Sequence, residues 1–306
     1  MDLSVSQWIQ STWTASRPKT KSLIITLFGD AIAPHGGAMR LGDLVSILGQ
    51  FGVDERLVRT SVFRLGKEGW LVAKRQGRRS VYSLTPNGML QFQRAYKRVY
   101  SDQYRQWDGS WTLVCMPPRR HAGPVWAKLE HELQWEGFGK IAPNVFGHPS
   151  PGLGALRELL DSLQLSNRVF VLSARSLDVF ATLPLTKFID ESWDLQNLEK
   201  GYHEFTRRFA PFGNAHPAPK LTRSESFIVR TLMIHWFRRV TLHDPQIPAE
   251  MLRDQWPGHF AYELCHRIYQ MIYRDAEDFL SQTVNASGSV LPELSPWFYH
   301  RFGGLT

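Results

Sequence analysis

The side chains whose types and spacing are most suggestive of binding chemistry lie in one basic stretch, residues 54–79. Helical spacing over residues 56–68 places apolar and small side chains on one side and polar ones on the other. An arginine can read guanine in the major groove, a threonine can offer its methyl or hydroxyl group, and phosphates accept Arg or Lys whatever the sequence. We therefore expect the polar side to contact DNA; its candidate residues are Arg56, Arg59, Thr60, Phe63, Arg64 and Lys67.

Two features of this surface leave alternatives open. Phe63 is out of place on a solvated face: it could touch a thymine methyl, or pack against a neighbouring hairpin or another domain. The arginines, taken one at a time, could equally be the ordinary charges of a surface helix. The next segment favours DNA binding, because residues 70–85 form two β-type runs joined at a glycine-containing turn with basic residues at its tip. Those residues, expected along the phosphate backbone or in a minor groove, are Lys74, Arg75, Arg78 and Arg79.

The elements that would position these side chains can be predicted from caps and periodicity. A first helix repeats apolar residues from Leu41 to Leu48, and glycines at 49 and 52 mark a turn. Asp54 is a candidate N-cap for the helix that carries the polar side, and Thr85 followed by Pro86 begins another helix. Helix, turn, helix and basic hairpin together predict a winged helix-turn-helix in residues 1–106.

Charge and composition agree with this prediction. Residues 54–105 hold 12 Lys or Arg and 4 acidic residues, a net charge of +8 that equals the net charge of the whole chain. The basic excess is therefore concentrated on one predicted motif, as in nucleic-acid-binding proteins. No signal-peptide pattern or apolar run of about 20 residues is visible, so we expect a cytoplasmic protein without membrane association. The two cysteines, Cys115 and Cys265, are expected as buried apolar residues, with a disulfide as the alternative.

The rest of the chain divides into two predicted domains. In residues 107–189, strands near 111–116, 141–146 and 168–173 alternate with amphipathic helices, which predicts a ferredoxin-like α+β domain. Residues 190–306 are expected to be all helical, with a capping box at Thr222 and Glu225 that opens an almost uniformly apolar helix. This C-terminal domain is a candidate region for effector binding or dimer formation. The overall fold class expected is α+β.

Several segments resemble one family in the same order along the chain. The matching segments are 22–30, 55–70, 77–80, 135–139, 234–240 and 301–305. Together they resemble the PaaX-type repressors of phenylacetate catabolism, over essentially the whole chain. The resemblance implies a homodimer that represses the genes of aerobic phenylacetate degradation and leaves its double-stranded DNA operator when phenylacetyl-coenzyme A binds.

An effector of that kind needs cations for its phosphates and an apolar pocket for its acyl end. One predicted helix supplies both kinds of side chain, and the candidates are Arg230, His235, Trp236, Arg238 and Arg239. Alternatively, Arg230 and His235 are core residues paired with carboxylates such as Glu225 or Asp244. Neither a cofactor nor a metal is expected.

Two competing functions remain at this point. The first is an enzyme, a coenzyme A-thioester hydrolase or a nuclease with a DNA-targeting N-terminal module, but the sequence contains no nucleophile elbow, metal motif or paired acids. The second is a structural DNA-binding protein without an effector. We expect a regulator rather than an enzyme.

Overall fold

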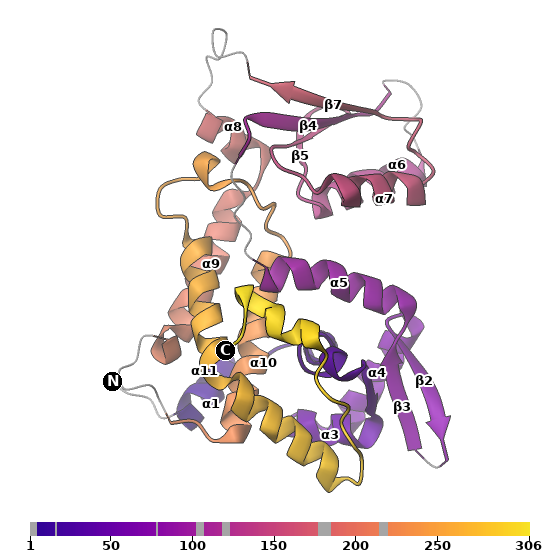
Figure 1. The fold of residues 1–306 in the computed structure, drawn as a ribbon, viewed down its shortest axis with the longest axis vertical. Helices are drawn as coiled ribbons and strands as arrows, with labels where there is room; N and C mark the ends of the chain where they lie inside the picture. The colour runs from indigo at the N-terminus through magenta and orange to yellow at the C-terminus, as the bar shows by residue number, and fades with distance from the viewer. Residues whose placement is uncertain are drawn as a thin grey trace. The chain divides into compact units, whose positions relative to one another are not determined.

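The computed structural model describes residues 5–15, 17–77, 79–101, 107–117, 123–176, 185–213 and 220–306. Helices predominate in these ranges, and two small antiparallel sheets accompany them (Figure 1), which confirms the α+β class. The chain forms two compact units that do not follow chain order. The first comprises Met1–Asp102, Glu204–Arg239 and Phe260–Thr306, and the second comprises Gln103–His203 and Val240–His259. The predicted N-terminal domain thus shares a unit with most of the C-terminal helical region.

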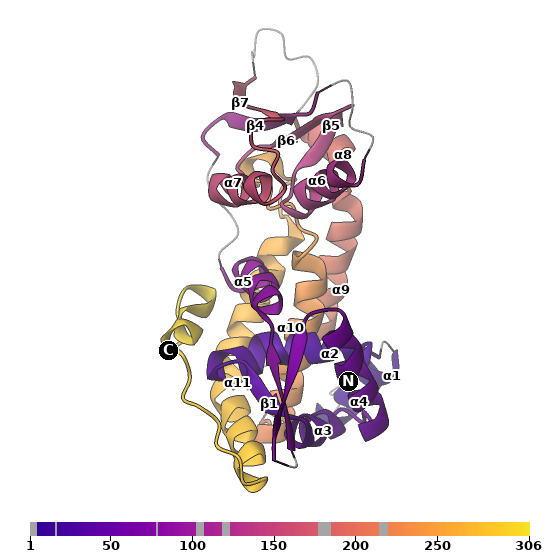
Figure 2. The same ribbon diagram turned by 90° about the vertical axis from the view of Figure 1, so that its right-hand side faces the viewer.

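The N-terminal part of the first unit holds the basic stretch. Its elements are α1 (Val5–Ala15), α2 (Thr20–Leu27), the π-helical η1 (Phe28–Ile32), η2 (Ala33–His35), β1 (Ala38–Arg40), α3 (Leu41–Gly49), α4 (Glu55–Lys67), β2 (Leu71–Gln76), β3 (Arg79–Leu84) and α5 (Pro86–Tyr100). The three strands form an antiparallel sheet in the order β1-β3-β2 (Figure 2). The β2–β3 hairpin agrees with the predicted one, whereas β1 was not predicted.

The helix boundaries follow from local hydrogen bonds. The Asp54 carboxylate accepts from the backbone N–H of Leu57 at 2.9 Å, and the Thr85 hydroxyl accepts from the N–H of Gly88 at 2.9 Å. Both predicted N-caps are confirmed. Gly88 is also needed sterically, because a Cβ there would overlap the backbone carbonyl oxygen of Trp70 at the base of the hairpin. The start of α5 is therefore fixed against the start of β2.

Helices complete the first unit. These are the end of α9 (Leu195–Gly213), most of α10 (Arg223–Thr241) and α11 (Pro257–Ala286), and the 3-10 segment η4 (Pro296–Gly303). The predicted capping box opens α10: the Glu225 carboxylate accepts from the Thr222 N–H at 2.9 Å, and the Thr222 hydroxyl accepts from the Glu225 N–H at 3.2 Å. Most apolar side chains of α10 and α11 are buried, as expected for central helices; Phe260 and Met271 of α11 are exposed.

The second unit is built on a four-stranded sheet. Its elements are β4 (Ser110–Cys115), α6 (Pro124–Trp135), β5 (Gly139–Ala142), β6 (Val145–His148), α7 (Leu153–Ser162), β7 (Phe170–Arg175), α8 (Leu185–Ser192) and η3 (Ala249–Met251). The strands pair in the order β5-β6-β4-β7, all antiparallel, which is the split βαβ arrangement of ferredoxin-like domains. Helices α6 and α7 lie on the same face of this sheet (Figures 1 and 2), and their leucines pack on Val114 and Phe146.

Candidate nucleic-acid interface

Helix α4 buries one side and exposes the other. The buried side consists of Val58, Ser61, Val62 and Leu65, each at most 5% exposed. Leu57, expected on this side, is 38% exposed, because it lies in the first turn at the margin of the apolar stripe. Burial of the other four against α2 and α3 holds the helix in place and turns its polar side to solvent.

The exposed side of α4 carries every predicted residue. The exposed side chains are Arg56, Arg59, Thr60, Phe63, Arg64 and Lys67. Phe63 is 60% exposed, and its ring face is approached by the Lys67 ammonium group at 4.8 Å. Phe63 therefore does not pack into a neighbouring core of this unit, which was one of the two predicted alternatives. A large exposed apolar ring among cations can instead contact a partner.

Two of these side chains make hydrogen bonds within the helix. Arg59 donates from Nε and Nη2 to the same carboxylate oxygen of Glu55, at 2.7 and 2.5 Å. The Thr60 hydroxyl donates to the Arg56 carbonyl oxygen at 2.8 Å. Arg59 must therefore exchange its bonds with Glu55 for bonds to a base or a phosphate if it binds DNA. Such a solvated pair contributes little to stability, so the exchange is inexpensive.

The hairpin offers a second exposed basic surface. From Val72 to Gln76 every residue of β2 is exposed, so this end of the strand projects from the core. Lys74, Arg75 and Arg79 are exposed, and the Arg75 guanidinium donates to the carbonyl oxygen of Gly77 in the turn at 3.1 Å. Arg78, also predicted to bind DNA, lies outside the described residues. Only residues 68–70 separate α4 from β2, which keeps the hairpin beside the helix (Figure 1).

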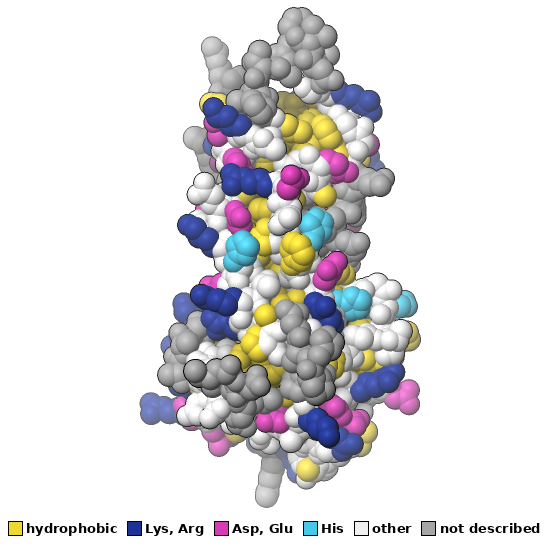
Figure 3. Space-filling view, turned by 90° about the vertical axis from the view of Figure 1, so that its left-hand side faces the viewer, with side chains coloured by type: hydrophobic (Ala, Val, Ile, Leu, Met, Phe, Trp, Pro, Cys, Tyr) yellow, Lys and Arg dark blue, Asp and Glu magenta, His cyan; other side chains and the backbone are white. Residues whose placement is uncertain are grey.

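The basic residues are therefore gathered rather than dispersed. On the described surface in Figure 3, acidic and basic side chains lie among one another, as on an ordinary solvated surface. Helix α4 and the hairpin differ from that surface. In the sequence of residues 55–67 and 71–84 there are eight Lys or Arg and one acidic residue, Glu55. A surface of one sign attracts the phosphate backbone of a nucleic acid.

In the same unit, a buried ionic cluster joins the N-terminal elements to the C-terminal helices. Asp30 in η1 accepts from Arg230 Nε at 2.9 Å and from Arg301 Nη1 at 3.0 Å. Arg230 binds Oδ2 of Asp30, whereas Arg301 binds Oδ1. The hydroxyls of Tyr100 and Tyr269 also donate to Oδ1, at 2.6 and 3.1 Å. Both arginine side chains are fully buried, so Asp30 is the carboxylate that compensates them most directly.

Glu277 in α11 extends the cluster. Its carboxylate accepts from Arg230 Nη1 at 2.6 Å and lies 2.8 Å from Nε2 of His35 in η2. Burial raises the pKa of Glu277, but Arg230 and His35 outweigh this effect and leave the pKa below its usual value. Glu277 is therefore ionised at neutral pH and supplies the second negative charge. Elements η1, η2, α5, α10, α11 and η4 are connected by this cluster, which we call the Asp30 cluster.

The predicted effector residues lie at different depths on α10. Arg230 and His235 are in the core, and their partners are Asp30, Glu277 and Thr26, not Glu225 or Asp244 as the alternative reading expected. Those partners come from elements far away in the sequence, whereas Glu225 is used in the capping box. Burial, then Arg238 and Arg239, lower the pKa of His235 to about 3, so its ring is neutral.

The other three candidates lie towards the C-terminal end of α10. Arg238 is partly buried, donates to the Thr26 hydroxyl at 2.9 Å and has a pKa lowered by burial. Arg239 is exposed, and its guanidinium lies 4.8 Å from the centre of the Trp236 ring. Within this helix Arg239 is the predicted effector residue that solvent reaches most freely. Effector binding here stays a prediction.

The described parts of the chain form neither a metal-binding cluster nor a disulfide. Among the described residues no cluster of three or more His, Cys, Asp or Glu side chains has metal-binding geometry. Cys115 and Cys265 are both free thiols in the structure, the first partly buried and the second fully buried. No helix within the described ranges is long and apolar enough to cross a membrane.

The Asp30 cluster and a first-unit pocket were missed by sequence reasoning. Asp30 interrupts the apolar run that begins at Leu23, and a carboxylate in a buried stripe was the available signal. Its partners could not be identified from spacing, because Arg301 lies 271 residues away. The pocket was missed for the same reason, because its residues come from α1, the α3–α4 turn and α10.

Comparison with known proteins identifies the family. Three family models match in order: "PaaX-like protein" at residues 19–88, "PaaX protein central Cas2-like domain" at 104–183 and "PaaX-like protein C-terminal domain" at 193–282. The transcriptional repressor PaaX of Escherichia coli (strain K12) is 35% identical over 300 residues, 97% of this chain and 94% of that protein. The uncharacterized protein Rv0674 of Mycobacterium tuberculosis has a similar fold, with a TM-score of 0.51 and 22% identity over 78% of this chain and 90% of that one. Matches of this extent show that the protein belongs to the PaaX family.

Proposed function

We propose that this protein is a DNA-binding transcriptional repressor and that residues 20–100 act as a winged helix-turn-helix. The observation that carries the proposal is the exposed basic side of α4 together with the exposed basic hairpin that follows it. The name of the E. coli relative, a transcriptional repressor, supports the same function. A regulator needs no catalytic group, and the proposed function uses none.

In the proposed complex, α4 enters the major groove and the hairpin follows the backbone or an adjacent minor groove. Arg56 and Arg59 lie in the first turns of α4, and residues at the N-terminal end of a recognition helix usually reach base edges. Phe63 can contact a thymine methyl. Lys74, Arg75 and Arg79 would bind phosphates, which adds affinity without sequence preference. Two copies of the chain, as a homodimer, would read two half-sites in double-stranded DNA.

The regulated genes and the signal are proposed from the family. We propose that the protein represses genes of phenylacetate catabolism in the cytoplasm and that phenylacetyl-coenzyme A releases it from DNA. Release requires that the effector bind the DNA-free form more tightly than the DNA-bound form, because a ligand with equal affinity for both shifts no equilibrium. The effector would thus select a form that cannot span the two half-sites.

The test is a binding titration at one fixed salt concentration. DNA from upstream of the chain's own gene or of a phenylacetate gene cluster is compared with random DNA of equal length, with phenylacetyl-coenzyme A, phenylacetate or coenzyme A added separately. We expect specific binding that the thioester alone weakens. Equal affinity for both DNAs would contradict a site-specific repressor. Specific binding unaffected by all three compounds would contradict the effector and leave a constitutive DNA-binding protein.

A further inference from the structure

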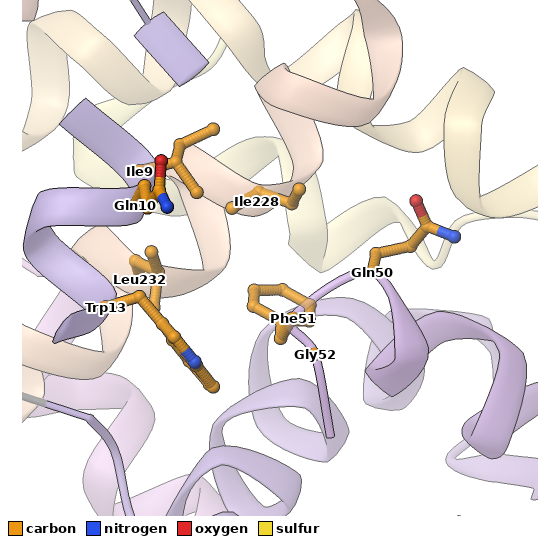
Figure 4. Close-up of a pocket in the computed structure, with 8 residues that line it drawn as sticks. All are labelled: Ile9, Gln10, Trp13, Gln50, Phe51, Gly52, Ile228 and Leu232. Atoms are coloured by element: carbon orange, nitrogen blue, oxygen red, sulfur yellow. The ribbon is translucent and has the colours of Figure 1, made fainter. Parts of the chain in front are cut away.

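A pocket lies in the first unit against the turn that joins α3 to α4. Its walls come from three segments: Ile9, Gln10 and Trp13 of α1, Gln50, Phe51 and Gly52 of the turn, and Ile228 and Leu232 of α10 (Figure 4). Phe51, Ile228 and Leu232 are buried and form its apolar floor. Gln10, Gln50 and Gly52 are exposed and complete the lining. The Gln50 carboxamide points away from the pocket (Figure 4) and accepts from the Ser224 hydroxyl at 3.4 Å. The site is therefore a small, partly open pocket with a mostly apolar lining, which suits the apolar end of a ligand.

The size of the pocket limits the ligand. Its volume is about 220 Å³. An engineered cavity of about 150 Å³ lined by similar side chains binds benzene, so this pocket has room for one aromatic ring with a short arm. The nucleotide part of a coenzyme A thioester does not fit inside. A ligand that fills the pocket with an aromatic acyl group must leave any large, charged remainder outside.

Arg17 lies beside the pocket, where its guanidinium can contact the charged part of such a ligand. Arg17 is exposed; its guanidinium lies 5.2 Å from the centre of the Trp13 ring and donates to the Gly52 carbonyl oxygen at 3.0 Å. It thus touches two residues of the pocket wall. A guanidinium in this position can bind a carboxylate or a phosphate without leaving the pocket edge. The apolar floor and the adjacent cation together fit an anionic compound with an aromatic end.

The pocket is also coupled to the helix that carries the proposed DNA contacts. Phe51 lies 6.2 Å from Trp13 and 6.3 Å from Phe227, measured between ring centres, so it links α1 to α10. Three residues after Phe51, Asp54 caps α4. A ligand that displaces Phe51 or Gly52 would therefore act on the start of α4 through a very short stretch of chain.

We propose that this pocket binds the aromatic acyl group of an anionic effector, whose charged part remains outside beside Arg17. The inference rests on the proposed effector-released repressor and assigns to it a site that differs from the predicted residues of α10. Trp13, Phe51 and the two α10 side chains enclose the ring, and Arg17 orients the polar part. Occupancy moves the α3–α4 turn and with it α4.

The test fills the pocket from α1. In Ile9→Trp the larger side chain occupies the space of the ring, whereas Ser11→Trp places the same bulk on the same helix, at an exposed position outside the pocket wall. Calorimetric titration with phenylacetyl-coenzyme A measures binding directly. Ile9→Trp should bind the thioester about ten to a hundred times more weakly, as expected for loss of one buried aromatic group. Ser11→Trp should match the wild type.

A second measurement does not depend on that variant folding. In wild-type protein with labelled isoleucine methyl groups, phenylacetyl-coenzyme A should shift the Ile9 and Ile228 signals through the ring current, and coenzyme A alone should not. Unchanged Ile9 and Ile228 signals at saturating thioester, or wild-type affinity in a folded Ile9→Trp, would overturn the assignment. DNA titrations of the same samples separate the two claims: thioester bound in the pocket without loss of DNA affinity supports the site and contradicts the proposed release.

Discussion

Replacing Asp30 by asparagine should destabilise the first unit far more than loss of an ordinary ion pair. Asp30 is 2% exposed and compensates two guanidinium groups that have no exposure at all. Asparagine keeps the size and one acceptor oxygen but removes the charge, so Glu277 alone would remain against Arg230 and Arg301. Removing one partner of a buried pair costs about 3–5 kcal/mol, since the remaining charge stays desolvated.

The exposed pair of Lys21 and Glu68 provides the matched control. These groups are 2.9 Å apart, and their side chains are 43% and 44% exposed. An exposed pair of this kind contributes about 0–1 kcal/mol, so Glu68→Gln should change stability by no more than that. Both variants remove one negative charge from a basic protein. The difference between their losses of stability therefore reports the effect of burial.

Hydrogen exchange of the amides in α10 and α11, followed by mass spectrometry, is the appropriate assay, because it reports the stability of these helices separately from the rest of the chain. Asp30→Asn should lower the free energy of opening of these helices by about 3–5 kcal/mol. A free energy of opening within about 1 kcal/mol of the wild-type value, or equal to that of Glu68→Gln, would refute the view that Asp30 neutralises the cluster.

Three further results are expected. In titrations at fixed salt, Arg59→Ala should weaken operator binding by about 1–3 kcal/mol if Arg59 contacts a base. Glu55→Gln removes the carboxylate that holds Arg59, so it should strengthen operator binding up to about fivefold. Weaker binding by Glu55→Gln would contradict this exchange of partners. Arg79→Gln should weaken operator and random DNA alike and reduce the slope of log K against log salt by about 0.9, so a loss confined to the operator would argue against a phosphate contact. His235 has a pKa of about 3 in the folded chain against an ordinary 6.5, so its contribution to stability is complete above pH 6.5 and is lost as the pH falls towards 3. The free energy of unfolding should thus be lower by about 2 kcal/mol at pH 5. In urea titrations His235→Gln should lack this loss at acidic pH; an unchanged pH profile would show that His235 is not the group responsible.

The sequence predicted the elements that depend on neighbouring residues. The caps at Asp54 and Thr85 and the capping box of α10 need only hydrogen bonds across three residues, so spacing and residue type sufficed. The polar side of α4 followed from helical periodicity for the same reason. The α+β class and the alternation of strands and helices in the middle of the chain were visible in the same way.

Features that depend on distant contacts could not be predicted. Strand β1 has three residues, too few to show alternation, and it exists because it pairs with β3 more than forty residues later. Arg230 was predicted on the correct helix, but its partners come from η1 and α11, and no spacing rule connects those segments. The pocket is likewise formed by residues from α1, a turn and α10 that become neighbours only in the fold.

The claim that α4 is the element that meets DNA can be tested most directly by photo-cross-linking. A benzophenone amino acid is introduced at Phe63, which is 60% exposed on α4, or at Phe260, which is 55% exposed on α11 in the same unit. The two positions share residue type and exposure and differ in the element that carries them. We predict operator cross-links from position 63 and none from position 260. Cross-linking at position 260 alone, or at neither position while the operator is bound, would contradict the account.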